Sequence, residues 1–245
     1  ELAYGDILSG LEGWDWNSDG YLGGYGNIYG GTNRVVYPSN FLYESRHPSG
    51  DRIIRVGGLT LRDSLSGNVI RQIENRIGFI GVQPQWSPNG ENFVISNSPF
   101  NDETSKSRQE LFLVDSEGNI TRLTYLTDFY DTAYLGRASW SPDGKYIAFW
   151  LDFVENRDPN PLLSVVNVAT REVVNYCIRG NWYTDTDSEF GLSWAPVWSP
   201  DSNYLVVESN QPDSTRQTYL VSLDEFKAYQ IFEYTWAVGW MLPPD

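Results

Sequence analysis

The stretch Trp140–Trp150, WSPDGKYIAFW, decides the fold of this chain. Near copies occur at residues 86–96, WSPNGENFVIS, and at residues 198–208, WSPDSNYLVVE. In each copy a tryptophan, a serine and a proline precede a turn at Asp or Asn, and an apolar run follows. One phrase that recurs every few tens of residues predicts an array of equal structural units.

Two weaker copies extend the series. Residues 46–51 read RHPSGD, and residues 240–245 read WMLPPD. The prolines of the five copies, at positions 48, 88, 142, 200 and 243, are separated by 40, 54, 58 and 43 residues. Such steps are typical of a four-stranded propeller blade with connections of varying length.

Each of four units divides into short runs rich in β-branched and aromatic residues, bounded by Gly, Asn, Asp and Ser turns. This composition is the signature of strands. The predicted strands are 41–46, 51–56, 59–67 and 68–73, then 81–86, 91–96, 110–119 and 120–126, then 136–140, 145–150, 162–170 and 171–178, and finally 195–198, 203–209, 218–223 and 227–232.

The phrase WSPDGKYIAF resembles the repeat of TolB-like β-propellers, which are also described as WD40-like. The resemblance covers residues 40–245 well and residues 1–39 poorly. Arg46-His47 replaces Trp-Ser in the first copy, and Ser202 replaces glycine in the fourth. The resemblance implies that the first strand of each blade lines a central channel. It also implies a role in protein–protein contacts, and it favours the periplasm or the outside of a bacterial cell.

We therefore expect an all-β fold, a single β-propeller domain over residues 1–245. A propeller ring has to close, because an open ring leaves a bare strand edge. Residues 41–242 supply the repeat blades, and 237–242 repeat the innermost strand of a fifth. The glycine-rich segment 1–40 is expected to complete that closing blade, which gives five four-stranded blades. The alternative is a fragment of a six- or seven-bladed ring.

The charge of the chain limits the classes of partner that it can bind. The net charge is −15, with 17 basic and 32 acidic residues and lysine only at positions 106, 145 and 227. This balance argues against nucleic acid and against anionic membrane surfaces, because phosphate binding needs a basic footprint. No apolar run is long enough for a membrane-spanning helix. The acidic residues are expected to keep an aromatic-rich protein in solution.

Histidine and cysteine each occur once, which restricts the possible chemistry. Because Cys177 is the one cysteine of the sequence, the chain can form neither an internal disulfide nor a zinc site built from cysteines. A Ser-His-Asp triad would have to use His47, which lies inside the repeat phrase and has an expected structural role. No nucleophile elbow, phosphate loop or dinucleotide fingerprint is present. We expect no catalytic activity from these residues.

The segment Asp15–Gly20, DWNSDG, is a candidate calcium loop. Asp15, Asn17 and Asp19 would offer oxygen ligands at alternate positions before a glycine turn. An EF-hand needs a glutamate at the twelfth position, where this chain has Gly26. The motif is therefore half of a calcium loop, and the alternative is an ordinary hairpin loop rich in Asx residues.

A second acidic loop lies between the third and fourth units. Carboxylates beside aromatic rings are also typical of sugar sites, and the alternative is a solvated loop. The candidate binding residues are Trp150, Asp152, Trp182, Asp185, Asp187 and Trp194. Two carboxyl groups about 5–10 Å apart in the channel would favour glycoside hydrolysis.

Three long insertions at 99–109, 151–161 and 210–217 occupy equivalent places in successive units, so they are expected to emerge on one face. Loops on a rigid frame commonly carry binding. We expect a non-enzymatic binding or scaffolding propeller whose partner is a protein. A glycan-binding or glycan-cleaving propeller, and the propeller of a larger peptidase, are the alternatives. Strand exchange by residues 1–32 would make the chain self-assemble.

Overall fold

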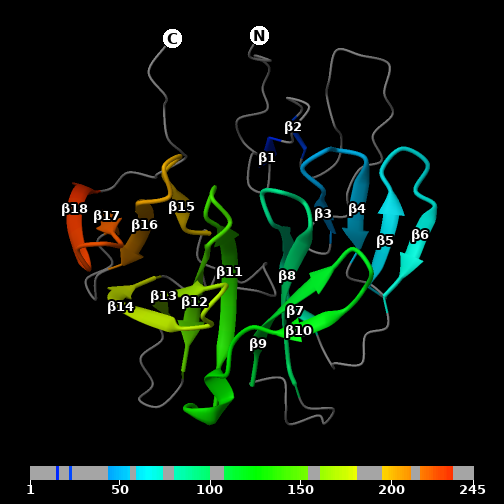
Figure 1. Cartoon of the computed structure of the whole chain (residues 1–245). Coiled ribbons are helices and arrows are strands. Elements are labelled where there is room, and N and C mark those ends of the chain that lie inside the picture. The colour runs from blue at the N-terminus through cyan, green and yellow to red at the C-terminus, as the bar shows by residue number, and fades with distance from the viewer. Residues whose placement is uncertain are drawn as a thin grey trace.

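The computed structural model describes residues 44–55, 59–73, 80–99, 108–153, 161–180, 195–210 and 216–233, together with two short strands at 15–16 and 22–23. This part of the chain contains four antiparallel sheets of four strands each and one two-stranded hairpin (Figure 1). The all-β propeller class predicted from the repeats is confirmed.

The four sheets are named blades 1 to 4, and each follows the chain as a simple meander. Blade 1 contains β3 (Glu44–Arg46), β4 (Arg52–Arg55), β5 (Thr60–Asp63) and β6 (Val69–Gln72). Blade 2 contains β7 (Ile80–Trp86), β8 (Asn92–Asn97), β9 (Glu110–Asp115) and β10 (Ile120–Arg122). Blade 3 contains β11 (Tyr134–Trp140), β12 (Tyr146–Asp152), β13 (Leu162–Asn167) and β14 (Val173–Arg179). Blade 4 contains β15 (Val197–Trp198), β16 (Tyr204–Asn210), β17 (Arg216–Ser222) and β18 (Lys227–Glu233).

The first strands of successive blades lie next to one another. β7 lies against β3 on one side and β11 on the other, and β15 lies against β11. Every strand predicted over residues 41–232 therefore has a counterpart in the described sheets. The hairpin of β1 (Asp15–Trp16) and β2 (Leu22–Gly23) forms a separate two-stranded sheet. The fifth blade stays a prediction, because most of 1–43 and all of 234–245 lie outside the described residues.

The hydrophobic core lies between neighbouring blades. Strand β12 contributes side chains to two such layers, which accounts for the apolar run in the repeat. Ile147, Phe149 and Leu151 point toward blade 2, where they pack with Val94 and Leu111. The alternate residues of the same strand, Ala148 and Trp150, pack on blade 4 with Trp198, Leu205 and Val207. Because both faces of β12 are covered, its sequence reads as a continuous apolar run rather than an alternating one.

The same arrangement joins blades 1 and 2. Phe93 and Ile95 of β8 face blade 1 and pack with Ile54 and Leu61, whereas Val94 faces blade 3. Phe93 and Ile54 are fully buried, as are Ile147, Phe149 and Leu151 of β12. Packing between sheets therefore fixes the order of the blades, while the hairpins fix the order of strands within each blade.

Candidate functional site

The tryptophan of the repeat phrase bonds each blade to the one before it. The indole Nε1 of Trp140 donates to the backbone carbonyl of Gln85 at 3.0 Å. Trp198 donates in the same way to Ser139 at 3.1 Å, and Trp86 donates to Ser45 at 3.3 Å. In every case the acceptor is the residue immediately before the Trp position of the preceding copy. The ring fills the gap between sheets while its polar edge is satisfied.

The serine and the Asx residue of the phrase hold the hairpin that follows. Ser141 Oγ donates to Asp143 Oδ1 at 2.7 Å and accepts from the backbone N–H of Tyr146 at 2.9 Å. Asp143 accepts from the N–H of Lys145 at 3.1 Å, and Gly144 takes a φ of +71°. The same bonds recur at Ser87 with Asn89, and at Ser199 with Asp201. These polar residues therefore build the frame.

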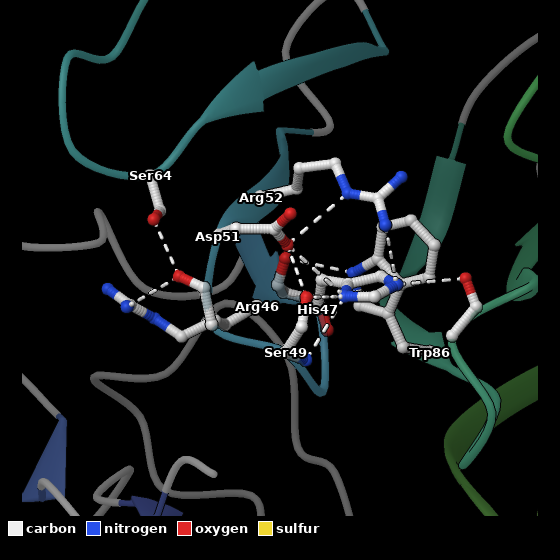
Figure 2. Close-up of polar contacts among 10 residues, drawn as sticks. Arg46, His47, Ser49, Asp51, Arg52, Ser64 and Trp86 are labelled. Carbon is white, nitrogen blue, oxygen red and sulfur yellow. Dashed lines mark hydrogen bonds and ion pairs between the residues drawn. The ribbon is translucent and has the colours of Figure 1, made fainter. Parts of the chain in front are cut away.

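His47 takes the place of that serine in blade 1, and Figure 2 shows the result. Its Nδ1 accepts from the backbone N–H of Ser49 at 3.1 Å and lies 2.5 Å from the Ser49 hydroxyl. Its Nε2 lies 3.0 Å from the carbonyl oxygen of Gly90 in blade 2 and 3.1 Å from Arg52 Nη2. The ring meets Trp86 edge-on, with centroids 4.7 Å apart.

This geometry does not suit general base catalysis by His47. A triad needs the imidazole between serine and carboxylate, with one ring nitrogen facing the nucleophile. Here the Ser49 hydroxyl stands between His47 and Asp51 and donates to Asp51. The His47 residue is only 7% exposed, and both ring nitrogens are engaged by protein atoms. The arrangement is a contact between the turns of blades 1 and 2, in agreement with the structural role expected from the sequence.

The carboxylates of the turns are held in their charged form. For Asp201, the hydrogen bond from the Ser199 hydroxyl lowers the pKa below its ordinary value of 3.8, helped by the N–H of Asn203. For Asp143, partial burial alone would raise the pKa, but the bonds from Ser141 and Lys145 outweigh it and lower the pKa. The turns therefore present fixed negative charge, already matched to local donors.

A buried carboxylate holds the connection between blades 2 and 3. Glu110, on β9, is fully buried and accepts from Arg122 at 2.7 Å and from the Thr124 hydroxyl at 2.5 Å. It also accepts from the backbone N–H groups of Leu126 at 2.9 Å and Thr127 at 2.8 Å. Four donors on one carboxylate compensate its loss of water. The start of the connection is thus tied to the sheet.

The connection itself, residues 125–134, is here called the aromatic connection. It contains a short 3-10 helix, Leu126–Asp128, and runs from β10 to β11 below the blades in Figure 1. Phe129 is 79% exposed, the largest value for a large hydrophobic side chain among the described residues. Tyr125 and Tyr134 are exposed as well. The strand predicted over 120–126 covers only the start of this segment; the sequence signal for the rest is its four aromatic residues within ten positions, in TYLTDFYDTAY.

Two of the predicted binding residues fall in the described blades. Trp150 lies on β12 in the core between blades 3 and 4 and is 1% exposed. A ring that stacks on a sugar needs a solvent-facing side, so Trp150 serves packing between the blades and not sugar binding. Asp152 is half-buried at the end of β12, where its backbone pairs with Tyr134. The two residues share one side of β12, but only Asp152 reaches solvent, so they do not form a common surface.

The other predicted residues mostly lie outside the described part of the chain. This holds for Asn17, Asp19, Trp182, Asp185, Asp187 and Trp194. Asp15 is placed by its backbone alone, paired with Gly23 in the β1–β2 hairpin. Within the described residues, no three His, Cys, Asp or Glu side chains gather as metal ligands. The calcium loop thus stays a prediction, as does the role of the three long insertions, whose central parts are not described.

No helix in the described ranges has the length and apolar character needed to cross a bilayer.

Solved structures show likeness to this chain at low identity. TolB from Agrobacterium tumefaciens is 20% identical, with a TM-score of 0.56 over 90% of this chain and 79% of its own. TolB from Acinetobacter baumannii is 16% identical, with a TM-score of 0.56 over 88% of this chain. Hydrazine synthase from Kuenenia stuttgartiensis is 16% identical, with a TM-score of 0.62 over 94% of this chain and 69% of its own.

These similarities show the β-propeller fold. The chain spans about half (52%) of the length of the Acinetobacter protein. The structures that it resembles include an enzyme as well as TolB proteins, so the fold by itself does not decide activity. No protein-family model and no curated protein sequence matches the chain.

Proposed function

We propose that this TolB-like β-propeller is a binding or scaffolding protein that contacts a protein partner outside the cytoplasm and catalyses no reaction. The observation that carries the proposal is the contrast between the repeat turns and the aromatic connection. The polar side chains of the turns are engaged in holding the frame, including the one histidine. The most exposed large apolar side chain of the described residues, Phe129, stands on a connection that is tied to that frame.

A rigid frame with exposed aromatic groups is suited to recognition. Interface cores are enriched in aromatic residues, and side chains that are already ordered lose little entropy on binding. The resemblance of the repeat phrase to TolB-like propellers supports the same class of function and an extracytoplasmic location. The net charge of −15 favours partners with basic surfaces over nucleic acid or anionic lipid.

The first test is the mass of the full chain in solution, measured by light scattering with and without a calcium chelator. A monomer of 27.9 kDa that the chelator leaves unchanged supports a propeller that acts through an outside partner. A larger assembly would make the chain its own building block. Dissociation of that assembly by the chelator would assign calcium to the loop of Asp15, Asn17 and Asp19.

A second test addresses the alternative of a glycan-cleaving propeller. The full chain is incubated with neutral and acidic oligosaccharides, and the products are separated by chromatography. Turnover that survives repurification would overturn the proposal of a binding protein. Binding of an oligosaccharide without turnover would keep the proposal of a binding protein but would replace the protein partner by a glycan.

A further inference from the structure

We propose that the aromatic connection is the docking surface for a basic, arginine-bearing polypeptide segment. This inference rests on the proposed function and names the site and the chemistry of the partner. Phe129, Tyr125 and Tyr134 are 79%, 42% and 37% exposed, and all three lie within ten residues. Single exposed apolar side chains are ordinary on proteins, whereas three exposed aromatic side chains on one short segment favour an interaction surface.

The connection is ordered before any partner arrives. Its first turn is bound by Glu110, and Leu126 and Thr127 are themselves buried. The backbone N–H groups of Phe129 and Tyr130 donate to the carbonyl of Leu126 at 3.0 and 2.9 Å. A partner that contacts Phe129 would therefore meet a surface that needs little ordering, which preserves binding energy.

Blade 3 and the start of β9 in blade 2 fix the far side of the same segment. The ring of Tyr130 stacks on Phe153 with centroids 4.7 Å apart, and its hydroxyl accepts from Asn175 at 3.1 Å. Ala133 accepts a backbone bond from Gln109, and the N–H of Leu135 donates to the Gln109 side chain. Phe129 is thus exposed between two anchored points.

Charge selects a basic partner. Asp128 and Asp131 are exposed on either side of Phe129. Two cations lie nearby: Arg122 is neutralised by buried Glu110 at 2.7 Å, and Arg108 donates to the carbonyl of Thr127 at 3.2 Å. Arg122 lies farther from Asp128, at 3.9 Å. The aromatic connection therefore carries excess negative charge, and the whole chain has the same sign. Long-range attraction and local pairing both favour a cationic segment.

The structure also indicates arginine in particular. The guanidinium of Arg122 lies 4.4 Å above the ring of Tyr125, so this cluster already accommodates one cation over an aromatic face. A partner arginine can stack on Phe129 in the same manner while its N–H groups bind the carboxylate of Asp128 or Asp131. Arginine supports stacking and forked hydrogen bonding together, which lysine does not.

The test uses the full chain and a synthetic peptide of alternating arginine and leucine, titrated by calorimetry. A second peptide has glutamate in place of arginine. The expected result is binding of the arginine peptide alone, weakened about tenfold or more by Phe129→Ser. The double substitution Asp128→Asn with Asp131→Asn should weaken it and reduce its salt dependence. The matched control is Phe226→Ser, which removes an exposed ring (68%) from the turn between β17 and β18 of blade 4.

Other outcomes overturn the inference. No binding of the arginine peptide, equal binding of the glutamate peptide, or a Phe129→Ser variant that binds as tightly as the natural chain would each do so. If the arginine peptide does not bind, and an oligosaccharide binds the natural chain but not Phe129→Ser, the surface is assigned to glycans. Circular dichroism melting of each variant confirms that binding is compared between folded proteins.

A crosslinking experiment separates this inference from the proposed function. A photoreactive phenylalanine analogue is placed at position 129 or at position 226, and crosslinked peptides are sequenced after irradiation in the native cells. An arginine-containing segment joined to position 129 alone supports the docking surface. A protein joined only to position 226 leaves the proposed function standing and overturns this site. Crosslinks at neither position overturn this docking surface and leave the proposed function standing for the rest of the chain's surface.

Discussion

The indole of Trp140 and the carbonyl of Gln85 are 55 residues apart in the chain and are joined by a hydrogen bond of 3.0 Å. Gln85 stands immediately before Trp86, the residue that corresponds to Trp140 in the preceding blade. Trp198 and Ser139 repeat the relationship 59 residues apart, and Trp86 and Ser45 repeat it 41 residues apart. The conspicuous tryptophan of the phrase is thus a bond between blades.

Replacing Trp140 by phenylalanine tests that bond. Phenylalanine keeps an aromatic ring in the gap but leaves the Gln85 carbonyl without this donor. We expect the free energy of unfolding to fall by about 1–3 kcal/mol, the usual cost of an unsatisfied polar group plus some lost packing. Urea denaturation measures it. An unchanged midpoint would show that water replaces the indole and that the bond between blades contributes no stability.

Gly90→Ala is expected to destabilise the chain more than Gly144→Ala. The two glycines have nearly the same backbone, with φ of +70° and +71°. A Cβ on Gly90 would lie 2.1 Å from His47 Nε2, whereas a Cβ on Gly144 meets only Pro88 Cδ at 4.0 Å. Both variants carry about 1–2 kcal/mol of left-handed strain, and Gly90→Ala adds about 1–3 kcal/mol of overpacking.

The double variant His47→Ser with Gly90→Ala gives the decisive comparison. Serine restores the residue found at this place in the other copies and removes the ring that a Cβ at position 90 would strike. The extra cost of Gly90→Ala should then shrink toward that of Gly144→Ala in a double-mutant cycle measured by urea denaturation. Additive losses would contradict a direct contact between these turns.

Glu110→Gln should loosen the start of the aromatic connection. The amide keeps one oxygen acceptor but loses the charge and places donors toward Leu126 or Arg122. We expect a loss of about 1–3 kcal/mol in unfolding free energy and faster hydrogen exchange at the amides of Leu126 and Thr127. Glu117→Gln, at an exposed turn, is the control and should change neither quantity. Unaltered exchange in Glu110→Gln would place the rigidity elsewhere.

Asp201→Asn isolates the pH dependence of one turn. A carboxyl group with a lowered folded-state pKa stabilises the folded chain above its unfolded value of 3.8, and this contribution disappears as the pH falls through the lowered value. The natural chain should exceed the variant in stability at neutral pH, and the difference should close as the pH falls through the lowered pKa of Asp201. Asparagine occurs naturally at the equivalent position 89, so the turn itself should persist.

Thermal melts from pH 7 to pH 2.5 provide the measurement. A stability difference that is the same at both ends would mean that it does not arise from the ionisation of Asp201. The lowered pKa of Asp201 would then have no consequence for folding.

Local bonds made much of this fold predictable. The hydrogen bonds of the repeat turn span two to five residues, as between Ser141 and Asp143 or Tyr146. Such bonds depend on residue types that stand next to one another, so each copy of the phrase predicts a strand, a turn and a second strand. The candidate site is less predictable from local sequence. Trp150 lies near Asp152 in the sequence and is predicted to bind sugar, but in the folded sheet it is a buried core residue.

The aromatic connection escaped prediction for a related reason. Leu126 and Phe129 are both apolar and only three residues apart, yet one is 4% exposed and the other 79%. The difference depends on Glu110, which lies before the connection on another strand and fixes the turn by its bonds to Leu126 and Thr127. No spacing rule contains that information.

The amino-acid sequence alone determined the all-β class, the strand order and the four repeated units of this propeller, because these follow from turn chemistry and alternation over a few residues. Tertiary structure decided which side chains became frame and which became surface. It put His47 against Gly90, Trp140 against Gln85, and Phe129 into solvent. Those outcomes depend on residues tens of positions apart, brought together when apolar faces of neighbouring sheets leave water.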